Sequence, residues 1–169
     1  MSASHAVQAA LAAANLTLRR AAPTDAAIVT AVVRAAYAKW IPVIGREPMP
    51  MRADYDDAIR ANRIDLIERT DGVVGLVETM ARADHLWIEN IAVRPDLHGR
   101  GVGRLLLRQA EAIAEAEGLA TLRLLTNGAF EANVTLYRRC GYVVDRTEPF
   151  MGGVTVHMSK ALARAANLA

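Results

Sequence analysis

A strand, a glycine-containing loop and a helix are expected to follow one another between Ile88 and Arg104. The segment reads Ile-Glu-Asn-Ile-Ala-Val-Arg-Pro-Asp-Leu-His-Gly-Arg-Gly-Val-Gly-Arg. The glycines at Gly99, Gly101 and Gly103 let a ligand approach the backbone N–H groups closely. The first amides of a helix lack partners inside the helix, and the helix dipole adds about half a positive charge there. The segment therefore predicts a binding site for an anion such as a pyrophosphate.

Arginines at the start of this helix support the same interpretation. Arg100 and Arg104 stand at the positive end of the dipole, and Arg104 faces Arg108 at i, i+4 spacing. Such like-charge pairs are unfavourable by about 0.2–0.5 kcal/mol unless an anion compensates them. The alternative is a solvated turn in which the arginines stay in water and the glycines serve geometry alone.

The loop differs from the two commonest phosphate-binding loops. A Walker loop ends in Gly-Lys followed by Ser or Thr, whereas Gly103 is followed here by Arg104 and Leu105. A dinucleotide fingerprint counted from Gly101 and Gly103 would need a third glycine at position 106, where Leu106 stands. The anion site must therefore be of another kind.

The loop closely resembles the acetyl-CoA loop of the GNAT superfamily of N-acetyltransferases. That signature is Gln or Arg, two residues, Gly, one residue, then Gly or Ala. Here the corresponding residues run from His98 to Gly103, with His98 in place of Gln or Arg, a departure on which the backbone cradle does not depend. The resemblance implies that coenzyme A, brought as acetyl-CoA, is bound by His98, Gly99, Arg100, Gly101, Val102, Gly103 and Arg104.

The resemblance covers roughly Leu16 to Ser159. The segment from Ile88 to Val93 is similar to the family's fourth strand, whose bulge frees backbone groups for the pantetheine arm; this implies coenzyme contacts at Ile91, Ala92 and Val93. The segment Asn-Val-Thr-Leu-Tyr-Arg-Arg-Cys-Gly-Tyr, from Asn133 to Tyr142, is similar to the family's later signature, with Cys140 where Leu is usual. The two signatures together are far more specific than either alone.

An amine acetyltransferase must first obtain a neutral amine. A lysine-like amine has a pKa near about 10.4 and is mostly protonated at neutral pH, and only the free amine attacks a thioester. The site needs a base or a water relay, an oxyanion donor and an acid for the departing thiolate. Direct attack in a ternary complex needs no protein nucleophile, so Cys140 is interpreted as a packing residue.

Tyr137 is the candidate acid, because the resemblance places its hydroxyl near the coenzyme sulfur. Asn133 lies one turn earlier on the same helical face, where it would bind the pantetheine or orient Tyr137. The alternatives are a Tyr137 hydroxyl tied to the backbone and an Asn133 that is simply a polar residue at the helix start.

Glu89 is the candidate base and would also face the acceptor amine. It shares the strand parity of Ile91 and Val93 and has apolar neighbours, and if these bury it, desolvation would make it a stronger base. The alternative is that Glu89 faces solvent or pairs with an arginine. Glu78, on the preceding strand, is a second and weaker candidate.

Specificity for the acceptor is expected in the segment that follows the first long helix, as the resemblance implies. Tyr37, Trp40 and Glu47 are the candidate substrate-binding residues, and Arg46 and Tyr55 stand close to them in the sequence. Aromatic rings and a carboxylate can receive a cationic amine. The alternative is that Tyr37 and Trp40 only anchor the helix on the sheet.

The elements that position these residues alternate in a mixed order. Strands are expected at 16–19, 64–68, 73–80, 85–93, 121–126, 142–147 and 154–159, and helices from Pro23 to Trp40 and at 54–62, 101–117 and 131–140. Thr70-Asp71-Gly72 predicts a hairpin turn. We therefore expect an α/β (α+β) fold: a mixed, mostly antiparallel sheet of about seven strands flanked by about four helices, as the GNAT-like fold implies.

The size and composition suit one enzyme domain. The chain has 169 residues, of which 53% are hydrophobic and 22% charged, and a formal net charge of +2 with no basic block. Residues 15–160 are expected to form the domain, after an N-terminal extension (1–14) that is either helical or disordered and before a tail (161–169). No run approaches the roughly 20 apolar residues of a membrane span, and the four histidines have no metal-ligand spacing.

These features predict a cytoplasmic N-acetyltransferase that uses acetyl-CoA and acts on a small-molecule or peptide amine. No metal, nucleic-acid or membrane partner is expected, and a homodimer is expected only by analogy with the superfamily. Transfer of a longer acyl group, modification of a protein lysine, and a non-catalytic CoA-binding sensor on the same fold remain the alternatives.

Overall fold

A seven-stranded sheet forms the centre of the computed structural model, which describes residues 2–163. The strands are β1 (Thr17–Arg20), β2 (Arg63–Arg69), β3 (Gly72–Ala81), β4 (Leu86–Val93), β5 (Thr121–Asn127), β6 (Val143–Phe150) and β7 (Gly153–Ala161). Their order in the sheet is β1-β2-β3-β4-β5-β7-β6, and every pair is antiparallel except β4 with β5. The expected mixed, mostly antiparallel sheet is confirmed.

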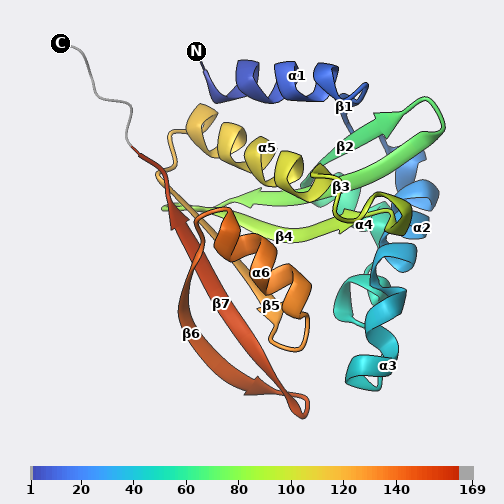
Figure 1. Cartoon of the computed structure of the whole chain (residues 1–169), viewed down its shortest axis with the longest axis vertical. Coiled ribbons are helices and arrows are strands. Elements are labelled where there is room, and N and C mark those ends of the chain that lie inside the picture. The colour runs from blue at the N-terminus through green and yellow to red at the C-terminus, as the bar shows by residue number, and fades with distance from the viewer. Residues whose placement is uncertain (1, 164–169) are drawn as a thin grey trace.

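Helices flank this sheet on both sides (Figure 1). They are α1 (Ala3–Ala13), α2 (Ala26–Tyr37), α3 (Ile41–Ile44), α4 (Tyr55–Ala61), α5 (Val102–Ala116) and α6 (Glu131–Arg139), with 3₁₀ turns η1 (Pro23–Asp25), η2 (Ala38–Trp40), η3 (Met49–Arg52) and η4 (Pro95–Leu97). The observed bounds of the predicted strands and of most helices lie within three residues of the expected ones. The first predicted helix, from Pro23 to Trp40, consists of η1, α2 and η2, and α3 follows directly and ends at the left-handed Gly45.

Local chemistry explains where the helices begin and end. The Asp54 carboxylate accepts hydrogen bonds from the amides of Asp56 and Asp57 and so caps α4. Gly101 precedes α5 and Gly118 follows it, and both have positive φ angles, +85° and +69°, which glycine adopts without a steric penalty.

Two hydrophobic cores lie on the two faces of the sheet. One face carries α1, α5 and α6, and Leu106 and Leu107 of α5 are fully buried there. The other face carries α2 and α4, with Val29 and Val33 of α2 fully buried. Each helix is amphipathic at the helical period, which is why its apolar side is removed from water by the sheet.

The N-terminal segment is part of the fold. Residues 1–14 were expected to be either helical or disordered, and the structure contains a helix there, α1. This helix lies beside α5 (Figure 1) and buries Val7 and Leu11 in the main core. At the other end, Ala161 still belongs to β7, and residues 164–169 of the expected tail lie outside the described residues.

One expectation about membrane-spanning segments is corrected. The consecutive helical pieces from Pro23 to Ile44 form a stretch of 22 residues that is long and apolar enough, by length and composition alone, to cross a membrane. In this fold its apolar side packs on the sheet, where Val29, Val32 and Ala36 are buried. Core helices of folded domains meet the same two criteria.

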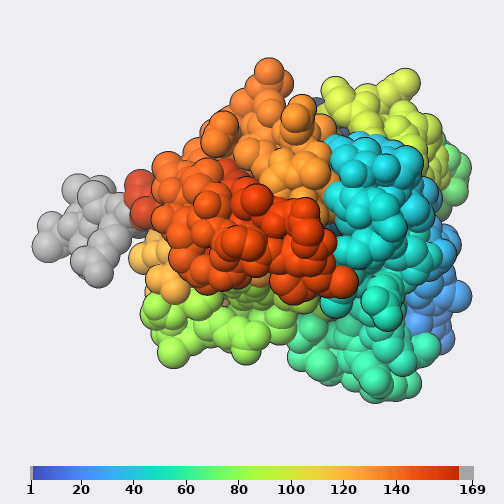
Figure 2. All heavy atoms as spheres, turned by 90° about the horizontal axis from the view of Figure 1, so that it is seen from below, coloured from blue at the N-terminus to red at the C-terminus, as the bar shows by residue number. Residues whose placement is uncertain are grey.

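Strands β4 and β5 separate soon after they begin. They pair only at Leu86 with Leu122 and at Trp87 with Arg123, and then diverge, as Figure 1 shows. In the space-filling view of Figure 2, the hairpin of β6 and β7 lies beside the segment that follows α2. The Arg46 guanidinium lies 5.8 Å from the centre of the Phe150 ring at this contact. The divergence and the hairpin together leave room for ligands at the middle of the sheet.

Candidate active site

The loop before α5 presents backbone amides that have no acceptor. The first amide with a partner in this helix is that of Leu105, which donates to the Gly101 carbonyl at 3.1 Å. Within residues 2–163, the four preceding amides, Gly101 to Arg104, donate to no protein oxygen. The left-handed φ of Gly101 (+85°) turns the chain into the helix at this point. The expected cradle for an anion is therefore formed by backbone groups at the positive end of α5.

A cavity of about 520 Å³ opens from this cradle. It runs between β4, the end of α2 and α6. Four of its lining residues carry basic side chains, Lys39, His98, Arg104 and Arg139, and no Asp or Glu is among the described residues that line it. The cavity is thus electrostatically suited to a polyanionic ligand.

Nine of the twelve residues expected to bind the coenzyme line this cavity. They are Ile91, Val93, His98, Gly99, Gly101, Gly103, Arg104, Asn133 and Tyr137. A Cβ at Gly103 would lie 3.0 Å from Leu136 Cδ2, so the Leu136 side chain would have to shift by a few tenths of an ångström to admit it. Gly103 thus lies where α5 closely approaches α6.

The other three expected coenzyme residues do not line the cavity with their side chains. Ala92 and Val102 are buried in the two cores, because each points to the interior face of its element. Arg100 is exposed and lies outside the cavity lining. For Val102 the backbone amide, one of the four without an acceptor, is the group that faces the cradle.

The bulge expected in the fourth strand is confirmed at Glu89. The register of β4 against β3 shifts there, since Ile88 pairs with Thr79 and Asn90 with Glu78. After the bulge, the Arg94 amide donates to Val74 of β3, so Val93 and Ile91 point their backbone groups the other way, toward the gap beside β5.

Side chains cover two of the carbonyls that face this gap. The Tyr37 hydroxyl lies 3.2 Å from the Ile91 carbonyl oxygen, and His98 Nε2 donates to the Val93 carbonyl at 2.7 Å. His98 Nδ1 lies 3.3 Å from Lys39 Nζ, which can only donate, so Nδ1 is the acceptor in this contact and Nε2 is the donor in the other. His98 therefore has a side-chain role of its own, which ties the loop to β4.

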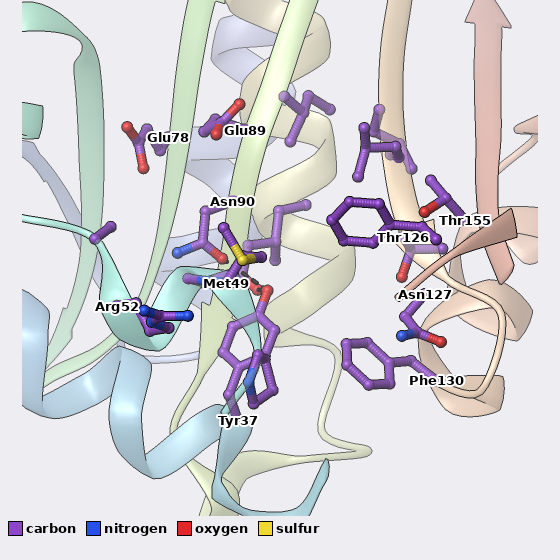
Figure 3. Close-up of a pocket in the computed structure, with 18 of the residues that line it drawn as sticks. Tyr37, Met49, Arg52, Glu78, Glu89, Asn90, Thr126, Asn127, Phe130 and Thr155 are labelled. Carbon is purple, nitrogen blue, oxygen red and sulfur yellow. Dashed lines mark hydrogen bonds between the residues drawn. The ribbon is translucent and has the colours of Figure 1, made fainter. Parts of the chain in front are cut away.

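A second cavity, of about 390 Å³, meets the first one at Tyr37, Ile91 and Tyr137. Figure 3 shows it from inside: Glu78, Glu89 and Asn90 come from the strands β3 and β4, and Met49 and Arg52 come from η3. The facing wall consists of residues from β5, β7 and the start of α6, namely Thr126, Asn127, Phe130 and Thr155. The two cavities therefore adjoin at these three shared residues.

Tyr137 has a buried ring and a free hydroxyl. It is 7% exposed, and its hydroxyl has no hydrogen-bond partner within residues 2–163, so the alternative of a hydroxyl tied to the backbone does not hold there. Burial raises the pKa of Tyr137 to about 12. The phenol is therefore protonated at neutral pH and available as a donor. Asn133 is half-buried one turn earlier and lines the first cavity.

The two candidate carboxylates differ in environment. Glu89 lines the second cavity but is exposed, and its Oε2 accepts a hydrogen bond from Trp87 Nε1 at 2.6 Å. The condition that apolar neighbours bury Glu89 is thus not met. Glu78 is 4% exposed; burial raises its pKa, an effect that the hydrogen bond from Asn62 Nδ2 at 2.6 Å opposes.

Tyr37 belongs to a buried polar network. Its hydroxyl donates to Asn90 Oδ1 at 2.7 Å, Asn90 Nδ2 donates to the Tyr55 hydroxyl at 3.0 Å, and that hydroxyl donates to the Pro50 carbonyl at 2.8 Å. Burial raises the pKa of Tyr37 and of Tyr55. The network fixes the position of Tyr37 where the two cavities meet.

Trp40 and Glu47, which were also expected to bind the substrate, do not line the second cavity. Trp40 lines the first cavity rather than the second and stacks on Phe130, with ring centres 4.6 Å apart. Glu47 lines neither cavity, and its carboxylate is paired with Arg34 at 2.8 Å. The packing of the helical pieces, which local sequence does not encode, decides both placements.

Sequence reasoning missed several lining residues. Asn90 gave a signal, because it is a polar residue at the buried parity of β4. Lys39, Arg52 and Arg139 gave none, since isolated basic residues on helices are ordinarily solvated and only the tertiary structure brings these to the cavities.

Comparison with known proteins agrees with this geometry. Residues 61–144 match the model of the acetyltransferase (GNAT) domain. The PaiA N-acetyltransferase from Thermoplasma acidophilum, solved in complex with coenzyme A, has a TM-score of 0.77 at 18% identity and covers 86% of this chain and 98% of its own. The ribosomal-protein-S18-alanine N-acetyltransferase from Escherichia coli has a TM-score of 0.73 at 20% identity and covers 91% and 98%.

At these identities the solved structures show the shared fold. The family is shown by the sequence match, which contains the bulged strand β4, the loop before α5 and the whole later signature from Asn133 to Tyr142. The chain therefore belongs to the GNAT acetyltransferase family.

Proposed function

We propose that the protein transfers the acetyl group of acetyl-CoA to a primary amine by direct attack within a ternary complex. The observation that carries this proposal is the meeting of two cavities at Tyr37, Ile91 and Tyr137. The first cavity has the charge and the free amides for a polyanionic cosubstrate, and the second has carboxylates for an amine. Two substrates bound there would present their reactive ends to each other.

The residues of the first cavity fit coenzyme A. The amides of Gly101 to Arg104 would receive the diphosphate, with Arg104, Lys39 and Arg139 nearby to balance its charge. The backbone amides of Ile91 and Val93, which face the gap beside β5, would donate to the pantetheine arm. In the PaiA N-acetyltransferase, which shares the fold, a coenzyme A complex has been solved.

Acetyl-CoA supplies an activated thioester whose carbonyl carbon accepts the amine. The amine nitrogen forms the new C–N bond, the C–S bond breaks, and the coenzyme leaves as a thiolate that must gain a proton. Tyr137 is the proposed source of that proton, because its phenol is protonated, lacks a protein partner and lines both cavities. The proton that the amine loses balances the one that Tyr137 gives up.

Glu89 is the proposed base, acting directly or through water on the acceptor amine. It lines the acceptor cavity two residues before Ile91, on the same face of β4. Glu78 is the alternative, since its burial raises its pKa toward the range of an effective general base. Substitution of each carboxylate by glutamine separates the two, because only loss of the base should lower kcat steeply.

The test is release of free thiol from acetyl-CoA in the presence of a panel of primary amines, together with calorimetric titration of coenzyme A. The proposal predicts binding of the coenzyme and amine-dependent thiol release, with the acetylated amine found by mass spectrometry. Tight coenzyme binding with no turnover on any amine would favour a non-catalytic sensor. Failure to bind coenzyme A would overturn the proposal altogether.

A further inference from the structure

Two arginines of the acceptor cavity have no carboxylate partner. Arg46 and Arg52 both line it, and neither forms an ion pair within residues 2–163. Neighbouring arginines behave differently: Arg34 is paired with Glu47 at 2.8 Å and Arg63 with Asp65 at 2.8 Å. The acceptor cavity therefore keeps two uncompensated guanidinium groups where nearby ones are neutralised.

Arg46 is held in place yet incompletely bonded. It lies between α3 and η3, its Nη1 donates to the Glu47 carbonyl at 3.3 Å, and its guanidinium lies 5.8 Å from the centre of the Phe150 ring. Its Nε–H is buried and has no acceptor within the described chain. A buried donor left unpaired is costly, so it implies a group that the protein itself does not provide.

Arg52 approaches the same cavity from the end of η3. Its side chain is exposed and, within residues 2–163, donates to no side chain or backbone oxygen, and Figure 3 shows it on the η3 side of the cavity. Because a guanidinium binds a carboxylate through two parallel N–H donors, Arg46 and Arg52 are suited to a planar anion.

The acidic and basic side chains of the acceptor cavity lie on different walls. Glu78 and Glu89 belong to β3 and β4, whereas Arg46 and Arg52 belong to the α3–η3 segment. Glu89 stands next to the junction with the coenzyme cavity, because Ile91, two residues on, lines both. An acceptor that uses both walls must be positive at the reacting end and negative at the other.

We propose, on the basis of the function proposed above, that the acceptor is a free amino acid with an apolar or aromatic side chain, whose carboxylate is bound by Arg46 and Arg52. Its amine points to Glu89 and Tyr137, and its side chain contacts Met49, Phe130 and Phe150. A cavity of about 390 Å³ holds such a small molecule. A peptide amine would carry its carboxylate too far from the reacting nitrogen to use both walls.

Matched acceptors test the carboxylate. Phenylalanine, phenylalaninamide and phenethylamine share the ring and the primary amine, and only the first has a carboxylate. Thiol release should give a kcat/KM for phenylalanine that exceeds the other two by roughly tenfold to a hundredfold, the range for hydrogen bonds between charged groups. Equal or better use of phenethylamine, or preference for a phenylalanine-initiated peptide, would overturn the inference.

Variants assign the preference to the two arginines. Arg46→Met and Arg52→Met should each raise KM for phenylalanine by about tenfold while leaving kcat/KM for phenethylamine within about twofold. Arg138→Met removes an exposed arginine of α6 that lines neither cavity and serves as the matched control, with no change for any acceptor. Loss of activity on all three acceptors alike in the Arg46 and Arg52 variants would count against carboxylate binding.

A binding measurement keeps this inference separate from the catalytic proposal. N-acetylphenylalanine should bind the coenzyme A complex at least about tenfold more tightly than N-acetylphenethylamine, and Arg52→Met should abolish the difference. If no amine is acetylated but this difference is found, the catalytic proposal fails and the carboxylate site stands. If amines are acetylated and the two products bind equally, the carboxylate site fails alone.

Discussion

At the scale of single residues, the Tyr137 hydroxyl is the group on which the proposed reaction depends most. It has no protein partner within the described chain, so its removal leaves no other buried group unsatisfied. Tyr137→Phe should lower kcat by about a hundredfold or more, the lower end for general acid catalysis, and change the Kd for coenzyme A by no more than about twofold. Steady-state kinetics and calorimetry measure the two effects.

The matched control is Tyr142→Phe. The Tyr142 hydroxyl is also buried without a partner in the described chain, but Tyr142 lines neither cavity, so its loss should leave kcat unchanged. Because the pKa of Tyr137 is about 12, the deficit of Tyr137→Phe should be the same at pH 7 and pH 9. An unaltered rate in Tyr137→Phe would remove this residue from the mechanism.

The buried carboxylate of Glu78 makes stability depend on pH. Burial raises its pKa in the folded protein, so the folded state binds this proton more tightly than the unfolded chain. The contribution of this proton to the free energy of unfolding is fully present below the pKa that Glu78 has in the unfolded chain, near about 4.3. It is lost as the pH rises through the higher pKa that Glu78 has in the folded protein. Glu78→Gln should therefore unfold at a higher temperature than the wild type at pH 8.

Thermal unfolding of both proteins between pH 4 and pH 8 checks this. The difference in Tm should shrink toward pH 4, where both side chains are neutral. A difference that stays constant, or grows in acid, would show that Glu78 is charged at no cost in the folded protein.

The residue scale also shows where sequence reasoning reached its limit. The parity of β4 placed Glu89 on the face of Ile91 and Val93, and that was correct. Parity does not determine exposure, however. The divergence of β4 from β5 opens the sheet beside Glu89, whereas Glu78 lies on β3, which is paired along both edges with β2 and β4.

At the scale of elements, the loop before α5 is the part that the proposed coenzyme site requires. Gly101→Ala should weaken coenzyme A binding, because a left-handed φ of +85° is costly for alanine and relief of that strain would turn the free amides away. A fall in affinity of about tenfold or more is expected by calorimetry.

Gly118→Ala is the control for this substitution. Gly118 ends the same helix with a φ of +69°, and a Cβ at either glycine would meet no atom within 4 Å. Both substitutions should therefore cost a similar 1–2 kcal/mol of stability, roughly, and only Gly101→Ala should affect coenzyme binding. Equal affinities in the two variants would argue against the loop as the binding site.

Elements were predictable where the sequence is strongly periodic or carries turn residues. The helix at α5, the hairpin at Thr70-Asp71-Gly72 and the strand β4 follow from local patterns, whereas the bulge in β4 was expected only from the resemblance to the family. The insertion of β7 between β5 and β6 and the short parallel pairing of β4 with β5 do not, since they depend on contacts between segments far apart in the chain. Those long-range contacts create both cavities.

At the scale of the whole molecule, the N-terminal helix α1 is expected to be a stabilising element without a part in ligand binding. Leu11 is 1% exposed and packs in the core beside α5. Leu11→Ala should destabilise the protein by about 2–5 kcal/mol and leave the affinity for coenzyme A unchanged. Denaturant unfolding and calorimetry measure these two quantities.

Gln8→Ala provides the comparison on the same helix. Gln8 is exposed, so its substitution should change the stability by no more than about 0.5 kcal/mol. If Leu11→Ala behaved like Gln8→Ala, the packing of α1 on α5 would be wrong. If it weakened coenzyme binding in the folded protein, α1 would have a functional role that the cavities do not indicate.

The two ligands meet only because distant segments converge on the gap beside β4. The end of α2, the start of α5 and the helix α6 surround the coenzyme cavity, and α3, η3 and the hairpin of β6 and β7 close the acceptor cavity (Figures 2 and 3). Composition and motifs indicated the first cavity. The second, with its separated charges, became visible only in three dimensions.

The most direct test is the crystal structure of the protein with coenzyme A. The diphosphate is expected within hydrogen-bonding distance of the amides of Gly101 to Arg104, and the sulfur at the junction beside Tyr137. A coenzyme bound at another surface, with these amides facing only solvent, would contradict the proposed coenzyme site.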